Sequence, residues 1–142
     1  MLTYATVEQL AEHVSAAQLD KLADGDDARY IREASRLVRR ATRNDRYDAT
    51  PAGIPTDPVL SDALTIATCV QVREWIANGV DPLAGAAGVT PAVASASVNG
   101  ASVSYDVATQ SAARARATVD VCDAARDILR AAGLASAAVG RV

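Results

Sequence analysis

Hydrophobic residues recur at steps of three and four along most of the chain, and this spacing predicts a mainly helical protein. One such segment begins at Asp26 or Asp27 and continues to about residue 43. Its apolar positions fall on one face of a helix and comprise Tyr30, Ile31, Ala34, Leu37, Val38 and Ala41. In the segment 58–78, by contrast, apolar residues cover most of the helix circumference. We therefore expect the 58–78 helix to form the buried centre of a small bundle of four to five helices.

Capping residues mark the predicted ends of the N-terminal helices. Thr6 and Gln9 have the spacing of a capping box, which predicts a short helix that ends near His13. Ser15 is a suitable N-cap for a second short helix over residues 16–23. We therefore expect two short helices before the longer one.

Similar signals delimit the central and final helices. Asp57 and Pro58 form an N-cap and N1 pair, and Gly79 is a C-cap residue. A final helix is predicted over about 111–132 and ends at Gly133. Its apolar side comprises Ala117, Val121, Ala124, Ala125, Ile128 and Ala132. We expect this side to pack on the bundle.

The stretch 94–106, with the sequence ASASVNGASVSYD, interrupts the helical pattern. Small apolar residues and serines alternate on both sides of Asn99-Gly100, a pair that favours a type I′ turn. One face of the resulting β-hairpin, at about 93–107, holds Ala94, Ala96, Val98, Ala101, Val103 and Tyr105. The other face holds Ser95, Ser97, Ser102 and Ser104. A shift of register by one residue would destroy this sorting, which supports the predicted pairing.

Two strands alone are marginally stable in water, so the apolar face of this hairpin needs a surface on which to pack. In one interpretation, that surface is the hairpin's own helices, and the strand edges face water. In the other, an edge or a face docks on another subunit. The residues alone favour neither interpretation clearly.

Length and composition indicate one soluble domain. We expect a single domain over residues 1–133 and a mobile tail over 134–142. Half of the residues are hydrophobic, but there is no Phe and one Trp, so the core should be poor in large side chains. Cys69 and Cys122 lie in apolar helical patterns and are expected to be buried. Neither a signal-peptide pattern nor an apolar run of roughly 18 residues is present, so we expect no membrane partner.

The arginines form the strongest polar pattern. Arg29, Arg32, Arg36, Arg40 and Arg43 recur at helical spacing on a face distinct from the apolar stripe. They form either a solvated face, partly balanced by nearby acids such as Glu33 at i+4 from Arg29, or a contact surface for an acidic subunit or DNA. The net charge of −3 argues against a protein whose main task is to grip nucleic acid.

The sequence holds no pattern typical of an enzyme. Its single histidine, His13, ends a short helix, and no Ser-His-Asp, metal-ligand or Gly-rich phosphate pattern is present. Catalysis needs an activated nucleophile or a tuned acid and base, and neither is indicated. We therefore expect no catalytic activity, no cofactor and no metal.

Residues 95–105, SASVNGASVSY, resemble the Ser-x-Ser-Val-Gly-x-x-Ser-Val-x-Tyr hairpin of head-to-tail adaptor proteins of long-tailed bacteriophages, also called connector or head completion proteins. The opening residues 4–11, YATVEQLA, also resemble those of the family. The order of short helices, central apolar helix, Gly/Pro loop, serine hairpin and C-terminal helix is similar too, so the resemblance covers nearly the whole chain. Asn99 stands where the family often has Gly, and Ala101 where an aromatic residue is frequent.

This resemblance implies a structural virion protein. Such adaptors form a homo-oligomeric ring, commonly of twelve copies, in the neck between head and tail. The ring lies under the portal protein and carries a stopper or tail-completion protein. DNA passes through its channel without sequence-specific binding. We accordingly expect assembly in the host cytoplasm and a final location in the virion neck.

The candidates for subunit or partner interfaces come from the hairpin, from the arginines between Arg29 and Arg43, and from two arginines of the predicted final helix. They are Ser95, Ser97, Val98, Asn99, Gly100, Ser102, Val103, Tyr105, Arg29, Arg32, Arg36, Arg40, Arg126 and Arg130. A second interpretation is a small helical DNA-associated regulatory protein that uses the arginines from Arg29 to Arg43. Such a regulator should bind duplex DNA with a steep salt dependence, whereas an adaptor should form rings. A small enzyme subunit ranks last.

Overall fold

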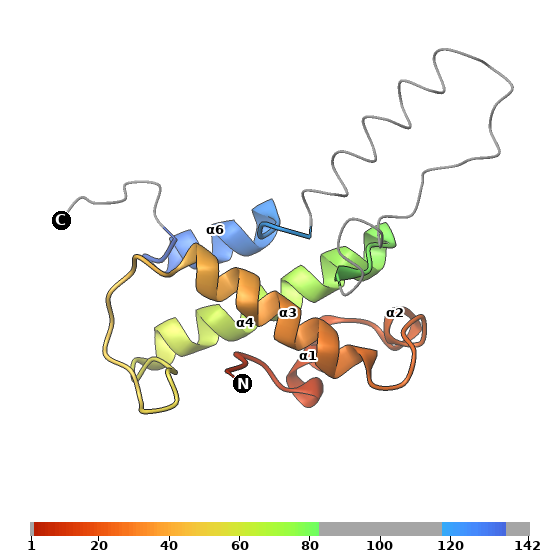
Figure 1. Ribbon diagram of the computed structural model, residues 1–142, viewed down its shortest axis with the longest axis horizontal. Coiled ribbons are helices and arrows are strands. Elements are labelled where there is room, and N and C mark those ends of the chain that lie inside the picture. The colour runs from red at the N-terminus through yellow and green to blue at the C-terminus, as the bar shows by residue number, and fades with distance from the viewer. Residues whose placement is uncertain (1, 83–117, 136–142) are drawn as a thin grey trace, which may run out of the picture.

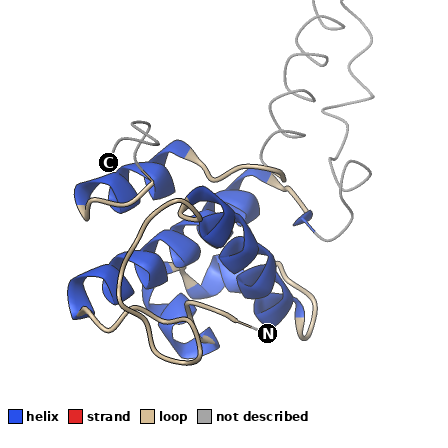
Figure 2. Ribbon diagram, turned by 60° about the vertical axis from the view of Figure 1, so that its left-hand side comes forward, coloured by secondary structure: helices blue, strands red, loops and turns tan. Residues whose placement is uncertain are grey.

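The computed structural model describes residues 2–82 and 118–135. Within these ranges the protein is mainly helical, as predicted (Figure 1). The described helices are α1 (Val7–His13), α2 (Ala16–Leu19), α3 (Asp26–Ala41), α4 (Pro58–Asn78) and α6 (Asp123–Ala131). Figure 2 shows these helices joined by loops, with no strand drawn in the described part. The hairpin predicted at about 93–107 lies outside the described residues.

Helix α4 is the centre of the fold, as its apolar circumference predicts. It contacts α1, α2, α3 and α6; in Figure 1, α3 crosses it and α6 lies alongside it. Six consecutive residues, 67–72, are buried, so neighbours cover every side of the helix over this stretch. Trp75 is 1 % exposed, and its ring meets the ring of Tyr30 edge-on at a centroid distance of 6.2 Å.

The predicted caps of α4 are both present. The Asp57 carboxylate accepts a hydrogen bond from the Val59 N–H at 2.9 Å, and Pro58 occupies the first turn. At the other end, Gly79 has a φ of 67°, a left-handed conformation that side chains other than Gly rarely adopt. Val80 N–H then reaches back to the Trp75 carbonyl at 2.9 Å and closes the helix.

The first two helices begin where the sequence predicts. The capping box of α1 is complete, because Thr6 Oγ1 accepts from Gln9 N–H and Gln9 Oε1 accepts from Thr6 N–H. Ser15 Oγ accepts from Gln18 N–H at the start of α2. The prediction that α2 reaches residue 23 is wrong, since it ends at Leu19 and tight i→i+3 turns follow.

The segment before α1 is fastened to both α3 and α4. Tyr4 N–H donates to the buried hydroxyl of Ser35 on α3 at 3.1 Å. The Tyr4 carbonyl accepts from the hydroxyl of Thr65 on α4 at 2.7 Å. Ser35 is therefore part of the buried face of α3, although its polar side chain hid it from the sequence pattern.

The C-terminal helix differs from its prediction. A continuous helix over 111–132 is wrong because residues 118–120 form a turn and α6 begins only at Asp123. Two hydrogen bonds capture backbone donors that a helix would use: the Asp120 carboxylate accepts from Val121 N–H, and Gln71 Oε1 accepts from Cys122 N–H at 2.6 Å. Residues 111–117 lie outside the described part of the chain.

This break also changes which residues of α6 face the core. The predicted apolar stripe assumed one uninterrupted helical register from residue 117 onward. In the structure, Ala125 and Leu129 are buried on α6, and the predicted stripe residue Ala124 is exposed. Leu129, absent from the predicted stripe, is fully buried.

The end of α6 folds back into the core. Gly133 has a φ of 85°, and Leu134 N–H donates to the Leu129 carbonyl at 2.8 Å, the pattern of a Schellman motif. Leu134 and Ala135, the first two residues of the expected tail, are buried. Residues 136–142 are outside the described ranges.

Candidate interaction surface

The arginines of α3 line its solvent-exposed side. Arg29, Arg32, Arg36 and Arg40 are all exposed, and Arg43 is exposed just beyond the helix end. The apolar stripe on the opposite side holds Tyr30, Ile31, Ala34, Leu37 and Val38 in the core. The helix therefore separates a buried face from a cationic face, as its two spacings predict.

The two halves of this cationic face differ in how their charge is balanced. In the N-terminal half, Arg29 pairs with Asp26 at 3.5 Å, and Arg36 pairs with Glu33 at 3.1 Å. The expected pairing of Arg29 with Glu33 is thus wrong, because Glu33 bonds Arg36 instead. These pairs are exposed and contribute little to stability, but they neutralise this part of the surface.

Four arginines gather around the C-terminal end of α3. We call this group the basic end; it consists of Arg39, Arg40, Arg43 and Arg46, all of them exposed. None of these four side chains forms an ion pair with another described residue. The carboxylate nearest to them in sequence, Asp45, accepts a hydrogen bond from Ala135 N–H at 2.7 Å.

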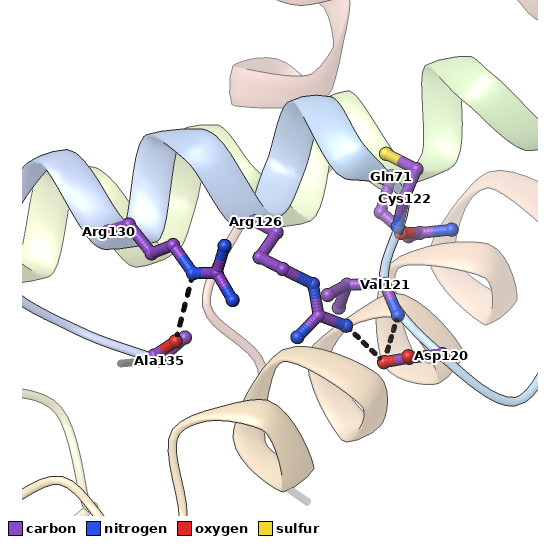
Figure 3. A network of polar contacts seen from close by, with 7 residues as sticks. All are labelled: Gln71, Asp120, Val121, Cys122, Arg126, Arg130 and Ala135. Atoms are coloured by element: carbon purple, nitrogen blue, oxygen red, sulfur yellow. Dashed lines mark hydrogen bonds and ion pairs between the residues drawn. The ribbon is translucent and has the colours of Figure 1, made fainter. Parts of the chain in front are cut away.

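The arginines of α6 lie beside the same end of the molecule. Arg126 pairs with Asp120 at 2.7 Å, and Arg130 Nε donates to the Ala135 carbonyl at 3.4 Å. Figure 3 shows both side chains extending from the same side of α6 toward these partners. Asp120 lies next to both Arg40 of α3, with which it lines a hollow, and Arg126 of α6, with which it forms an ion pair. Predicted interface residues that are far apart in sequence therefore lie close together in the structure.

A hollow of about 380 Å³ lies between the basic end and the turn before α6. Its lining consists of Arg40, Ala41, Arg43, Asn44, Val119 and Asp120. Val119 is 53 % exposed, so an apolar side chain stands in the open beside two arginines. This combination of guanidinium groups and exposed apolar surface is typical of protein–protein contact regions.

A second hollow, of about 310 Å³, lies on the other side of Arg43. Arg39, Tyr4 and Tyr47 contribute to its walls. Burial, together with the neighbouring Tyr47, raises the pKa of Tyr4 to about 12, and Arg39 opposes this shift. The Tyr4 hydroxyl is therefore neutral at physiological pH, and the charged residues that line this hollow are Arg39, Arg43 and Asp45.

The two thiols are unsuited to nucleophilic or metal chemistry. Burial raises the pKa of the Cys69 thiol to about 11, and burial also raises the pKa of Cys122. A protonated thiol is a poor nucleophile and a poor ligand. Cys69 is fully buried in the core, and Cys122 is half-buried at the N-cap of α6.

Among residues 2–82 and 118–135, no group of His, Cys, Asp and Glu side chains is arranged to hold a metal ion. No helix in these ranges is long and apolar enough to cross a membrane.

The predicted interface residues thus fall into three sets. The hairpin residues Ser95, Ser97, Val98, Asn99, Gly100, Ser102, Val103 and Tyr105 lie outside the described ranges. Arg29, Arg32 and Arg36 lie along α3, whereas Arg40, Arg126 and Arg130 lie near its C-terminal end. Sequence reasoning missed Arg39, Arg46 and Val119, although the run RRATRNDR at 39–46 is a local signal for concentrated positive charge.

Comparison of the chain with family models, curated proteins and solved structures found no match.

Proposed function

We propose that this protein is a structural component of a bacteriophage virion, a head-to-tail adaptor. Copies form a homo-oligomeric ring between the portal protein and the next neck or tail component, a stopper or tail-completion protein. DNA passes through the channel of the ring during ejection. The resemblance of residues 95–105 to the adaptor hairpin carries this proposal.

The described helices support the proposal through their order. Two short helices come first, α3 and the apolar α4 follow, and α6, packed against α4, comes near the C-terminus. Apart from α3, which the resemblance does not specify, this is the order that the resemblance implies for the described part of the chain. The alternating residues of the hairpin sequence predict a hairpin with one apolar and one serine face. The apolar face of such a hairpin needs a surface on which to pack, and the neighbouring copies in a ring would supply one.

The cationic surface agrees with contacts to protein better than with a tight grip on DNA. Two arginines of α3 are neutralised by acids of the same helix, and the whole chain carries a net charge of −3. A protein that depends on phosphate contacts for affinity lines its binding face with unpaired cations. Here the arginines without an ion pair among the described residues are grouped at the basic end, beside Asp120 and the exposed Val119. Weak contact with DNA also suits a channel through which the duplex must move.

Negative-stain electron microscopy of the purified protein, alone and mixed with the portal protein of the same phage, tests this proposal. We expect rings in at least one of the two samples. A monomer in both samples would contradict the adaptor function. A parallel titration with duplex DNA at several salt concentrations tests the regulatory alternative, for which affinity should fall steeply with salt.

A further inference from the structure

Helix α3 connects two oppositely charged ends of the molecule. At its N-terminal side, the acidic segment 20–27 contains four aspartates and one lysine. At its C-terminal side, residues 39–46 contain four arginines and one aspartate. The helix has 16 residues, so the two ends lie roughly 24 Å apart on one rigid element.

The helix dipole accounts for only part of this separation of charge. Acids in the first turn and bases in the last turn stabilise a helix, which explains Asp26, Asp27, Arg39 and Arg40. The effect falls off within one turn, however, and the charged residues extend further. Asp20 and Asp24 precede the helix, and Arg43 and Arg46 follow it, without an ion pair to another described residue.

We infer that the basic end of one copy binds the acidic segment 20–27 of a second copy, so that copies associate head to tail. The binding site is the hollow of about 380 Å³ in which Arg40, Arg43 and Val119 lie together. The occupant carries matching chemistry, since the exposed carboxylates of Asp20 and Asp24 flank the partly buried side chain of Leu22. Guanidinium groups meet carboxylates, and Val119 gains an apolar neighbour.

The exposed apolar residue in the site favours a protein occupant over DNA. Val119 is 53 % exposed between the charged groups of the hollow, and a phosphate backbone offers no apolar surface to cover it. A peptide segment with both carboxylates and an aliphatic side chain matches the two arginines and Val119 together.

The exposed arginines in the middle of α3 favour a head-to-tail contact over a closed dimer. Two copies with antiparallel α3 helices side by side would also pair acidic with basic ends. That arrangement would bring the exposed Arg32 and Arg36 of one copy against the same residues of the other. A head-to-tail contact avoids this repulsion and leaves one acidic and one basic end free, so further copies add until a ring closes.

This inference rests on the proposed ring and names the contact within it. The test uses two charge-reversed variants of the full chain. The first, Asp20→Lys with Asp24→Lys, makes both ends basic; the second, Arg40→Glu with Arg43→Glu, makes both ends acidic. All four side chains are exposed, and none forms an ion pair within the described ranges, so the fold should persist. Circular dichroism melting of each variant checks this.

Sedimentation velocity at low ionic strength measures the association. We expect the wild type to form species larger than a dimer, and each variant alone to associate on the order of tenfold more weakly. An equimolar mixture of the two variants should regain assembly, because every acidic site then faces a basic one. Added salt should weaken both the wild type and the mixture, since the Debye length falls to about 10 Å at 0.1 M.

Two controls each reverse one charge outside the proposed contact, half the change of charge in either double variant. Arg73→Glu and Asp62→Lys both lie on the exposed side of α4. Both should assemble like the wild type.

Several results would overturn the inference. One is that either folded variant assembles as strongly as the wild type, and another is that the mixture of the two variants fails to assemble. The inference also fails if the wild type stays monomeric at low salt or stops at a dimer. If the folded variants still form rings on the portal in the microscope, this contact is wrong but the adaptor function stands. If the wild type forms no ring in any sample, the adaptor function itself fails.

Discussion

Helices α3 and α4 are neighbours, yet they differ in how much of their surface is buried. Neighbouring elements cover α4 on all sides over residues 67–72, and apolar residues cover most of its circumference. Only one side of α3 is buried, and its other side presents arginines to solvent. The difference indicates that α4 and its contacts supply most of the stability of the fold, whereas the exposed side of α3 is available for binding. Changes on the two helices should therefore affect different measurements.

The largest loss of stability is expected for Trp75→Ala on α4. This substitution empties the most voluminous fully buried position and removes the edge-on contact with Tyr30. The free energy of unfolding should fall by about 3–5 kcal/mol, measured by urea denaturation with circular dichroism. The control Val59→Ala changes a residue of the same helix that is 65 % exposed, and it should cost less than about 0.5 kcal/mol. Equal losses would contradict the central role of this part of α4.

Alkaline pH should lower the free energy of unfolding, because each of the two helices holds a buried group that loses its proton at high pH. These groups are the Cys69 thiol on α4 and the Tyr30 hydroxyl on α3. Burial raises the pKa of Cys69 on α4 from 9.0 to about 11 and that of Tyr30 on α3 from 10.0 to about 12. Because the folded-state values exceed the unfolded ones, this stabilisation is complete below pH 9 and is lost as the pH rises toward 12. Cys69 alone should account for about 2–3 kcal/mol by pH 11.

Urea denaturation under reducing conditions at a series of pH values measures this effect. The variant Cys69→Ala should show a shallower decline above pH 9 than the wild type, because one titrating group has been removed. An identical slope for the two proteins would show that Cys69 ionises as easily in the folded chain as in the unfolded one.

A smaller effect is expected at Gln71, the polar residue inside α4. Gln71→Leu introduces an apolar side chain of similar size and leaves the Cys122 N–H without its acceptor. The loss should be about 1–3 kcal/mol, reduced because the Gln71 Nε2 group, buried without a partner among the described residues, also disappears. Hydrogen exchange should quicken at the start of α6 more than in α1. Arg73→Leu, on the exposed side of the same helix, is the control; uniform exchange changes would argue against a local role.

The smallest effect is expected on the exposed side of α3. Arg36→Ala removes an ion pair with Glu33 that is open to solvent. The free energy of unfolding should change by less than about 0.5 kcal/mol in a urea titration. A loss above 1.5 kcal/mol would mean that this side of α3 supports the fold, and the contrast between the two helices would no longer hold.

The sequence predicted those features that depend on neighbouring residues. The bounds of α4 follow from Asp57, Pro58 and Gly79, which act within one turn of the helix ends. The capping box of α1 and the buried face of α3 are local in the same sense. The hairpin predicted around Asn99-Gly100 stays a prediction.

Features that depend on distant residues could not be predicted in this way. The start of α6 is set in part by Gln71, which lies 51 residues before the backbone group it binds. Leu134 and Ala135 appeared to follow the last helix as a tail, but the Schellman turn at Gly133 returns them to the core. The meeting of Arg40 and Arg126 around Asp120 likewise depends on how α3 and α6 pack against α4. Helical spacing alone carries no information about such packing.

The hydrogen bond between Asp45 and Ala135 joins positions that are 90 residues apart in the chain. Asp45 follows α3 and Ala135 follows α6, so the bond joins the segments that come directly after these two helices. A pull on the chain beyond Ala135 is therefore transmitted to the basic end of α3 directly, and not only through the packing of α6. In the proposed ring, this bond would make the end of α6 and the basic end of α3 move together.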